Sequence, residues 1–381
     1  MHAIHSPHFV LNRRFTLIPY GLCLAIGSII VSIGDPMMLS PRMPSAENVL
    51  LSQKAAHADD TELPAFLRQR FSIRASNRRD NGDMIQLIRP LAEALAPSVV
   101  QIVSDGTPVS LGTIVSSDGY VLTKRSELSG DPIRVRLADA RLLPARVAAV
   151  RRQSDLALIR IEGAGGDLKP ITFAQETEAV VGSFLVSVGR TGVPIGLGAV
   201  SVRPRTVEHN GRLGVVLVDE RGQATVRGVW PDSGAESAGI KQGDQIIAID
   251  DRNETSRNAV IQALRGMFPG ESVKLTINRE GETLNLVAKI QDFGVMQETE
   301  NDTKVNGPRS VRLSGFERVL QHDTVLNPDE CGGPVIDTSG RVIGMNIARA
   351  GRVVSYALPA SLVVPEVTSM LAEARGQAGG K

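Results

Sequence analysis

The sequence has few cysteines, few aromatic residues and little net charge, and each shortage excludes a class of protein. Its 381 residues include two cysteines, Cys23 and Cys331, which excludes a disulfide framework and a cysteine metal cluster. Aromatic residues make up 3% of the chain, so we expect a core of Val, Ile, Leu and Ala, whose β-branched members favour strands. The net charge of +1, from 42 basic and 41 acidic residues, gives no electrostatic signature for nucleic acid.

Long hydrophobic runs are also scarce, and the one that stands out covers residues 15–34, directly after Arg13 and Arg14. Basic residues before such a run predict an export signal or a single membrane anchor. The Ala-His-Ala stretch at 56–58 would suit a signal peptidase, so cleaved and uncleaved forms both stay open. We expect an exported chain in the periplasm or cell envelope, either released or anchored to the inner membrane.

The rest of the chain divides by composition and period. Residues 35–82 are rich in Pro, Ser, Arg and Asp and aperiodic, which predicts a disordered tether. Short apolar or alternating runs follow at the spacing of an all-β barrel, and a strand-rich block with a helical patch interrupts them. We expect a leader at 1–34, the tether, a barrel domain in two parts at 83–210 and 311–375, an inserted domain at 211–291, a linker at 292–310 and a tail at 376–381.

Five segments in order carry a resemblance to a known family. They are GTIVSSDGYVLT at 112–123, SDLALIRI at 154–161, VSVGRTGVPIGLGAVS at 186–201, DECGGPVIDTSGRVIGMNIA at 329–348 and SYALPASLV at 355–363. Together they resemble trypsin-like serine peptidases of the HtrA/DegP type. The resemblance implies a mostly β fold, the chymotrypsin/trypsin-like double β-barrel. With the strand pattern, it predicts six-stranded barrels at roughly 95–165 and at 180–210 plus 310–360.

The same resemblance locates the catalytic positions, and most are altered. Asp155 matches the triad Asp, whereas Ser126 occupies the position of the catalytic His. Cys331 stands where the family has its nucleophilic Ser, and Asp329 replaces the Gly whose backbone N–H helps to form the oxyanion hole. We therefore expect a catalytically degenerate peptidase domain with a weakened oxyanion hole.

The absence of the catalytic His removes the general base and acid that peptide hydrolysis requires. A thiol can replace a hydroxyl as nucleophile, but at its ordinary pKa of about 8.5 it is only a few per cent thiolate at pH 7. Ser126 cannot protonate a departing amine as an imidazolium does. The alternative is an active cysteine endopeptidase that uses Cys331 with an unconventional base. The candidate bases are His322, His209 and Lys124, each of which is more simply a strand or loop residue.

The inserted block at 211–291 resembles a PDZ domain of the bacterial HtrA kind, on the strength of VRGVWPDSGAESAGIKQGDQIIAID at 226–250. The resemblance implies that a loop of Arg212, Leu213, Gly214 and Val215 binds a terminal carboxylate while the peptide adds a strand beside it. Helical spacing places Val260 and Leu264 on the wall of the pocket for an apolar side chain. Met267 continues this spacing and is at least as consistent with core packing.

We therefore expect a protein that binds unfolded proteins or peptide C-termini, as a scaffold, adaptor or chaperone in protein quality control. The family resemblance implies a homo-oligomer, a trimer in most members. The sequence gives no sign of a cofactor, a metal site or a nucleic-acid partner.

Overall fold

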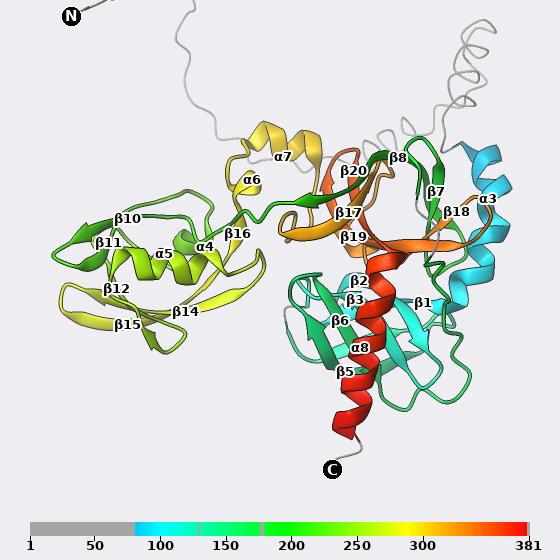
Figure 1. Cartoon of the computed structure of the whole chain (residues 1–381), viewed down its shortest axis with the longest axis horizontal. Coiled ribbons are helices and arrows are strands. Elements are labelled where there is room, and N and C mark those ends of the chain that lie inside the picture. Colours follow the sequence, from blue (N-terminus) through cyan, green and yellow to red (C-terminus); the bar gives the residue numbers. More distant parts are fainter. Residues whose placement is uncertain (1–80, 129, 176–178, 379–381) are drawn as a thin grey trace, which may run out of the picture. The chain divides into compact units, whose positions relative to one another are not determined.

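A computed structural model describes residues 81–128, 130–175 and 179–378 of the chain (Figure 1). The hydrophobic run at 15–34 and nearly all of the expected tether lie outside the described residues. The helices among the described residues lack the length and hydrophobicity that a membrane span requires.

The first barrel is a closed, antiparallel sheet in the order β1-β2-β3-β6-β5-β4. Its inward side chains are aliphatic, as the composition predicts, and a cluster that includes Ile102, Ile114 and Ile159 fills it. The strands are β1 (Val99–Ser104), β2 (Thr107–Ser116), β3 (Tyr120–Lys124), β4 (Ile133–Arg136), β5 (Leu142–Arg151) and β6 (Leu156–Ile161).

The second barrel is closed in the order β17-β20-β19-β18-β7-β8, so it is built from two separate stretches of the chain. Two of its strands precede the inserted domain and four follow it. The expected double barrel is confirmed, with six strands in each barrel. The strands are β7 (Phe184–Val188), β8 (Pro194–Val207), β17 (Phe316–His322), β18 (Pro334–Asp337), β19 (Val342–Gly351) and β20 (Val354–Pro359).

The inserted domain is a separate sheet in the order β10-β11-β12-β14-β15, with β13 paired to β12 and its own aliphatic core. Strand β10 lies at one edge, and the short strands β9 and β16 pair where the chain enters and leaves. The elements are β9 (Gly211–Arg212), β10 (Val215–Glu220), β11 (Gln223–Val229), α4 (Gly234–Ser237), β12 (Gln245–Ile249), β13 (Arg252–Asn253), α5 (Arg257–Arg265), β14 (Ser272–Arg279), β15 (Glu282–Lys289) and β16 (Gln291–Asp292).

The segment at 292–310, expected to be a plain linker, contains two short helices, α6 (Phe293–Met296) and α7 (Glu300–Asn306). Both begin at capping side chains: Asp292 accepts a hydrogen bond from the Gly294 N–H, and Thr299 forms a capping box with Asp302. The remaining helical elements are α3 (Gly82–Leu95), η3 (Ala96–Ser98), η4 (Pro328–Glu330) and α8 (Ala360–Ala378).

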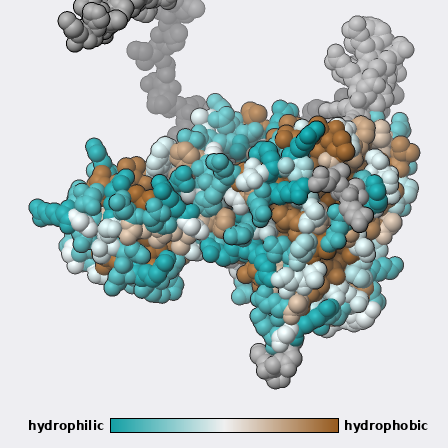
Figure 2. Space-filling view, viewed as in Figure 1, coloured by the Kyte–Doolittle hydropathy of each residue, from teal (hydrophilic) through white to brown (hydrophobic). Residues whose placement is uncertain are grey.

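A hydrophobic core joins the two barrels and the C-terminal helix α8. Leu122 and Leu158 of the first barrel, Phe316 and Met345 of the second, and Met370 of α8 belong to one buried cluster. The barrels therefore share apolar surface that neither could bury alone. On the face drawn in Figure 2, hydrophilic residues predominate and hydrophobic residues show in small groups between them.

A series of hydrogen bonds between buried polar side chains crosses the second barrel. The His322 ring, which is fully buried, lies 2.9 Å from Thr324 Oγ1 and 3.0 Å from Asn346 Oδ1. The side chain of Asn346 in turn donates to Ser187 Oγ at 3.0 Å. Burial lowers the pKa of His322 to about 4, so the imidazole is neutral at neutral pH.

We expect His322 to make the barrel acid-sensitive. Its folded pKa of about 4 lies below its ordinary value of 6.5, so the unfolded chain binds the proton first as the pH falls. The contribution of neutral His322 to the free energy of unfolding is therefore fully present above about pH 6.5. It is lost as the pH falls towards 4, by up to about 3 kcal/mol. Urea unfolding at pH 7.5 and 4.5 should show a smaller pH effect in His322→Gln. An equal effect in both proteins would contradict the assignment.

Candidate functional site: the triad positions and the groove of the inserted domain

The position of the catalytic His holds Ser126 on the loop after β3, and this serine is bonded to Asp155 at two points. The Ser126 backbone N–H donates to Asp155 Oδ1 at 2.9 Å, and its hydroxyl donates to Oδ2 at 2.8 Å. Asp155 is fully buried between β5 and β6, with φ at +58°. A buried carboxylate needs hydrogen-bond donors, and the serine provides them.

Buried cations balance the charge of Asp155. The guanidinium of Arg312, a fully buried side chain, lies over the rings of Phe268 and Phe316, with its carbon 4.0 and 4.7 Å from their centroids. It donates to the backbone carbonyls of Arg152, Gln153, Ser314 and Gly315. Burial raises the pKa of Asp155, an effect that Arg312 and Lys124 oppose, and burial lowers the pKa of Arg312 to about 10. No motif or period in the sequence pointed to Arg312.

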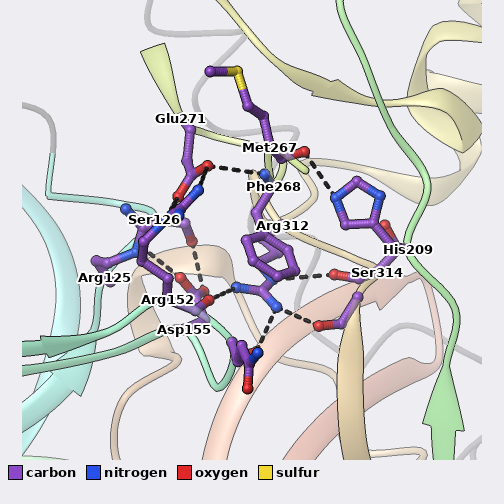
Figure 3. A network of polar contacts seen from close by, with 12 residues as sticks. Arg125, Ser126, Arg152, Asp155, His209, Met267, Phe268, Glu271, Arg312 and Ser314 are labelled. Atoms are coloured by element: carbon purple, nitrogen blue, oxygen red, sulfur yellow. Dashed lines mark hydrogen bonds and ion pairs between the residues drawn. The ribbon is translucent and has the colours of Figure 1, made fainter. Parts of the chain in front are cut away.

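The inserted domain contacts this cluster through its α5–β14 loop (Figure 3). Glu271 accepts hydrogen bonds from Arg125 at 2.8 Å and from Arg152 at 2.6 and 2.7 Å. Burial would raise the pKa of Glu271, but the bonds from Arg152 and the Phe268 N–H outweigh it and the pKa is lowered. A Cβ on Gly270 would lie 3.2 Å from Ser126 Cβ, so the loop approaches the His position closely.

Cys331, at the nucleophile position, is a buried thiol without a base. Its sulfur lies 3.7 Å from the Asn327 carbonyl oxygen and 4.0 Å from Ser310 Oγ. Burial raises the pKa of the thiol to about 11, so it is protonated at neutral pH. Among the described residues, no imidazole or amine forms a hydrogen bond with this sulfur.

The three candidate bases are engaged elsewhere. His322 is bonded to Thr324 and Asn346, and a ring nitrogen of His209 lies 2.7 Å from the Met267 carbonyl oxygen. Lys124 is fully buried, and its ammonium donates to Glu127 at 2.8 Å. Burial would lower the pKa of Lys124, but its interactions with Glu127, Cys331 and Asp155 outweigh it and the pKa is raised. A protonated ammonium cannot accept a proton from the thiol.

The oxyanion position is closed by a backbone hydrogen bond. Asp329 lies in the short helix η4, and the N–H of Cys331 donates to the Pro328 carbonyl at 3.2 Å. An oxyanion hole requires N–H groups directed at the position of the developing charge. Gly332, with φ at +101°, follows directly, and a Cβ there would lie 2.0 Å from the Leu111 carbonyl oxygen of the first barrel. The turn is thus held tightly against β2.

A second candidate site is a cavity of about 380 Å³ in the inserted domain, between strand β10 and helix α5. The four residues of the expected carboxylate loop line it, and Gly214 has φ at +91°. A Cβ on Gly214 would lie 2.2 Å from Ser233 Cβ, so the loop conformation requires glycine. Leu264 also lines the cavity, as the helical spacing predicts.

The structure differs from the sequence prediction at Val260, which is fully buried in the core of the inserted domain and does not line the cavity. The groove face of α5 is rotated by about one residue, so Ile261 lines it instead. Met267 packs against the same core, which agrees with the structural interpretation of its spacing. Arg257, at the start of α5, also lines the cavity, and Trp230, Phe293 and Met296 reach it from other elements; helical spacing gives no signal for these four.

Two domain families match the sequence. The trypsin-like peptidase domain matches residues 110–236, and the PDZ domain matches residues 211–290. The peptidase match runs into the start of the PDZ match and ends before β17–β20, because the inserted domain interrupts the second barrel.

Curated relatives match parts of the chain. The "Probable periplasmic serine endoprotease DegP-like" of Hahella chejuensis is 33% identical over 28% of this chain and 24% of that protein. The "Probable periplasmic serine protease do/HhoA-like" of Haemophilus influenzae is 30% identical over 48% of this chain and 36% of that protein. The chain thus spans about a third or less of the length of these two relatives. A crystal structure of the serine endoprotease from Yersinia pestis is 18% identical and covers 54% of this chain and 97% of that chain, but its TM-score of 0.27 adds no weight.

The double barrel and the sequence matches define a trypsin-like peptidase fold that carries a PDZ domain. Within that class, the chain is similar to proteins of the HtrA/DegP type.

We expect Cys331 to be unreactive in the folded protein. Because the pKa is raised to about 11, about 0.1% of the thiol is ionised at pH 8, and burial blocks access to it. Iodoacetamide at pH 8 should label Cys331 slowly in the native protein and rapidly in urea. Peptide mapping separates its signal from that of Cys23, and Cys331→Ala provides the blank. Rapid native labelling would contradict the assignment.

Proposed function

We propose that this HtrA-like protein is a pseudo-peptidase that binds the C-termini of peptides or unfolded proteins through its PDZ domain. In this function it acts as a scaffold, adaptor or chaperone in protein quality control. The observation that carries the proposal is the pair of hydrogen bonds from Ser126 to Asp155. They occupy the carboxylate that would otherwise orient a catalytic imidazole, and Ser126 cannot replace the imidazole as acid or base.

Two further features oppose catalysis independently. The Cys331 thiol stays protonated, with its sulfur beside the Asn327 carbonyl oxygen, and its N–H is bonded to Pro328 where an oxyanion would need it. Loss of the base in a serine peptidase costs on the order of 10⁶ in turnover, or roughly 8 kcal/mol of transition-state stabilisation. The closed oxyanion position adds to this loss.

The groove supports the binding half of the proposal. Strand β10 is an edge strand, and an extended peptide can pair with an open edge. The loop before it, around Gly214, lies at one end of the groove, where backbone N–H groups can bind a terminal carboxylate. Leu264 and Ile261 provide an apolar wall for the last side chain of the peptide. This combination favours a peptide with a free C-terminus and an apolar last residue.

The relatives and the basic residues near the N-terminus support a periplasmic location. The curated relatives are named as periplasmic proteases, which supports a periplasmic location for this chain. The basic residues before the hydrophobic run at 15–34 support export.

We expect the purified protein to cleave neither casein nor unfolded model substrates above background. The double substitution Ser126→His and Cys331→Ser should also stay inactive, because Gly270 crowds the loop at 126 and the oxyanion position is closed. Fluorogenic casein hydrolysis measures both proteins. Cys331→Ala serves as the control: turnover that this variant abolishes would promote the cysteine-peptidase alternative.

We also expect a C-terminal amide to bind more weakly than the matched free acid. The loop N–H groups lose a charge-assisted partner, at a cost of roughly 1.5–3 kcal/mol, or about ten- to a hundredfold in affinity. Calorimetry on the full chain with paired peptides ending in Leu tests this. Leu264→Ala should weaken binding of the acid, whereas Val287→Ala, an exposed position outside the groove, should not. Equal affinity for acid and amide would refute carboxylate recognition.

A further inference from the structure

The segment that leads from α7 back to the second barrel passes the nucleophile position. At Gly307, φ of +68° and ψ of −171° turn the chain out of α7, a conformation that is open essentially to glycine alone. Three residues further on, the buried Ser310 places its Oγ 4.0 Å from the Cys331 sulfur. The chain therefore holds one of its own residues directly beside the thiol.

Ser310 is bonded to the edge of strand β19. Its N–H donates to the Arg349 carbonyl at 3.0 Å, and the Arg349 N–H donates to Ser310 Oγ at 3.0 Å. This pair resembles one step of an antiparallel ladder in which a hydroxyl replaces a carbonyl. Arg349 is paired with Ser355 of β20 on its other side, so Ser310 occupies the remaining edge. The Arg349 guanidinium also donates to the Asn306 carbonyl at 2.8 Å.

The same segment is bonded to the first barrel. The Val311 N–H donates to Glu127 Oε1 at 3.1 Å, and Glu127 directly follows Ser126 in the loop after β3. A Cβ on Gly270 would lie 2.8 Å from a methyl carbon of Val311, so the α5–β14 loop packs closely on the segment. Residues 307–311 therefore reach from β19 to the Ser126 loop. We call the space between these two elements and Cys331 the peptidase cleft.

A substrate would need the space that this segment occupies. In a productive complex the reacting atoms lie about 3–3.5 Å apart, so a scissile carbonyl would have to come that close to the Cys331 sulfur. An extended peptide also pairs its backbone with a neighbouring strand edge. Ser310 lies beside the sulfur, and the edge of β19 at Arg349 is already bonded to it. A peptide can follow this edge to Cys331 only after the segment has left.

We propose that residues 307–311 are an internal occupant of the peptidase cleft, bound in the place of an extended peptide between β19 and the Ser126 loop. The cleft accepts a peptide only when this segment detaches. The segment therefore closes the cleft by occupancy, independently of the residues at the triad positions. The inference does not depend on peptide binding by the PDZ domain.

The test measures how readily the segment opens, with Cys331 as the reporter. Ser310→Gly removes the hydroxyl that accepts from the Arg349 N–H, and Gly307→Ala places a Cβ 3.1 Å from the Arg349 guanidinium at an unfavourable φ. Each substitution in the full chain should raise the native rate of iodoacetamide labelling at pH 8 about five- to tenfold, the effect of losing about one net hydrogen bond.

A matched substitution and low urea separate local opening from general instability. Val305→Ala changes a residue of α7 that is 63% exposed and should leave the labelling rate unchanged. Detachment of a short segment exposes little surface, so the faster labelling should depend weakly on urea below the unfolding transition. Unchanged rates in both segment variants, or rates that rise steeply with low urea, would overturn the proposal.

A crosslink tests the occupancy without weakening the segment. In Ser310→Cys, the new thiol should form a disulfide with Cys331 when the native protein is treated with diamide, because the side-chain atoms at these positions are neighbours. Ser314→Cys places a thiol at another buried serine of the same stretch and should form none. Peptide mapping identifies the bridge. Absence of the bridge at 310, or equal crosslinking from 310 and 314, would show that the segment does not occupy the cleft.

Discussion

The geometry around the triad positions depends on one buried carboxylate, Asp155. A fully buried charge is unfavourable unless donors and counterions surround it, and here the N–H and hydroxyl of Ser126 donate to its two oxygens. The cations of Lys124 and Arg312 contribute the balancing charge. In an active peptidase of this fold the carboxylate orients an imidazole. In this chain the same carboxylate ties the Ser126 loop to the turn between β5 and β6.

The PDZ domain is coupled to the same cluster. The guanidinium of Arg312 lies between Phe268 of the inserted domain and Phe316 of the second barrel, while Glu271 binds two arginines of the first barrel. An arginine stacked on aromatic rings and bonded to carbonyls is satisfied without a direct carboxylate partner. The loop that would face substrate in an active site instead contacts the inserted domain. The stacking of Arg312 on Phe268 and the ion pairs of Glu271 both stabilise the contact between the inserted domain and the barrels.

The groove of the PDZ domain is a cavity of about 380 Å³ whose lining combines three kinds of group. Its edge strand offers hydrogen bonds, its loop holds Gly214 in a conformation that suits glycine, and its helix α5 provides apolar and cationic side chains. Phe293 and Met296 reach it from the segment that leads back to the second barrel. The groove thus gathers backbone, apolar and cationic groups in one domain, while Ser126 and Asp155 in the other are bonded to each other.

The sequence by itself determined the local features: the strands of both barrels from their period, the interruption by a PDZ domain, and the residues Ser126 and Cys331 at the expected His and Ser positions. These follow from alternation and from motif order. Only the tertiary structure decided that Arg312 stacks on Phe268, that Ile261 rather than Val260 faces the groove, and that Phe293 lines it. Each of these depends on contacts between segments distant in the chain, or on the rotation of a helix by about one residue, and neither leaves a periodic signal in the sequence.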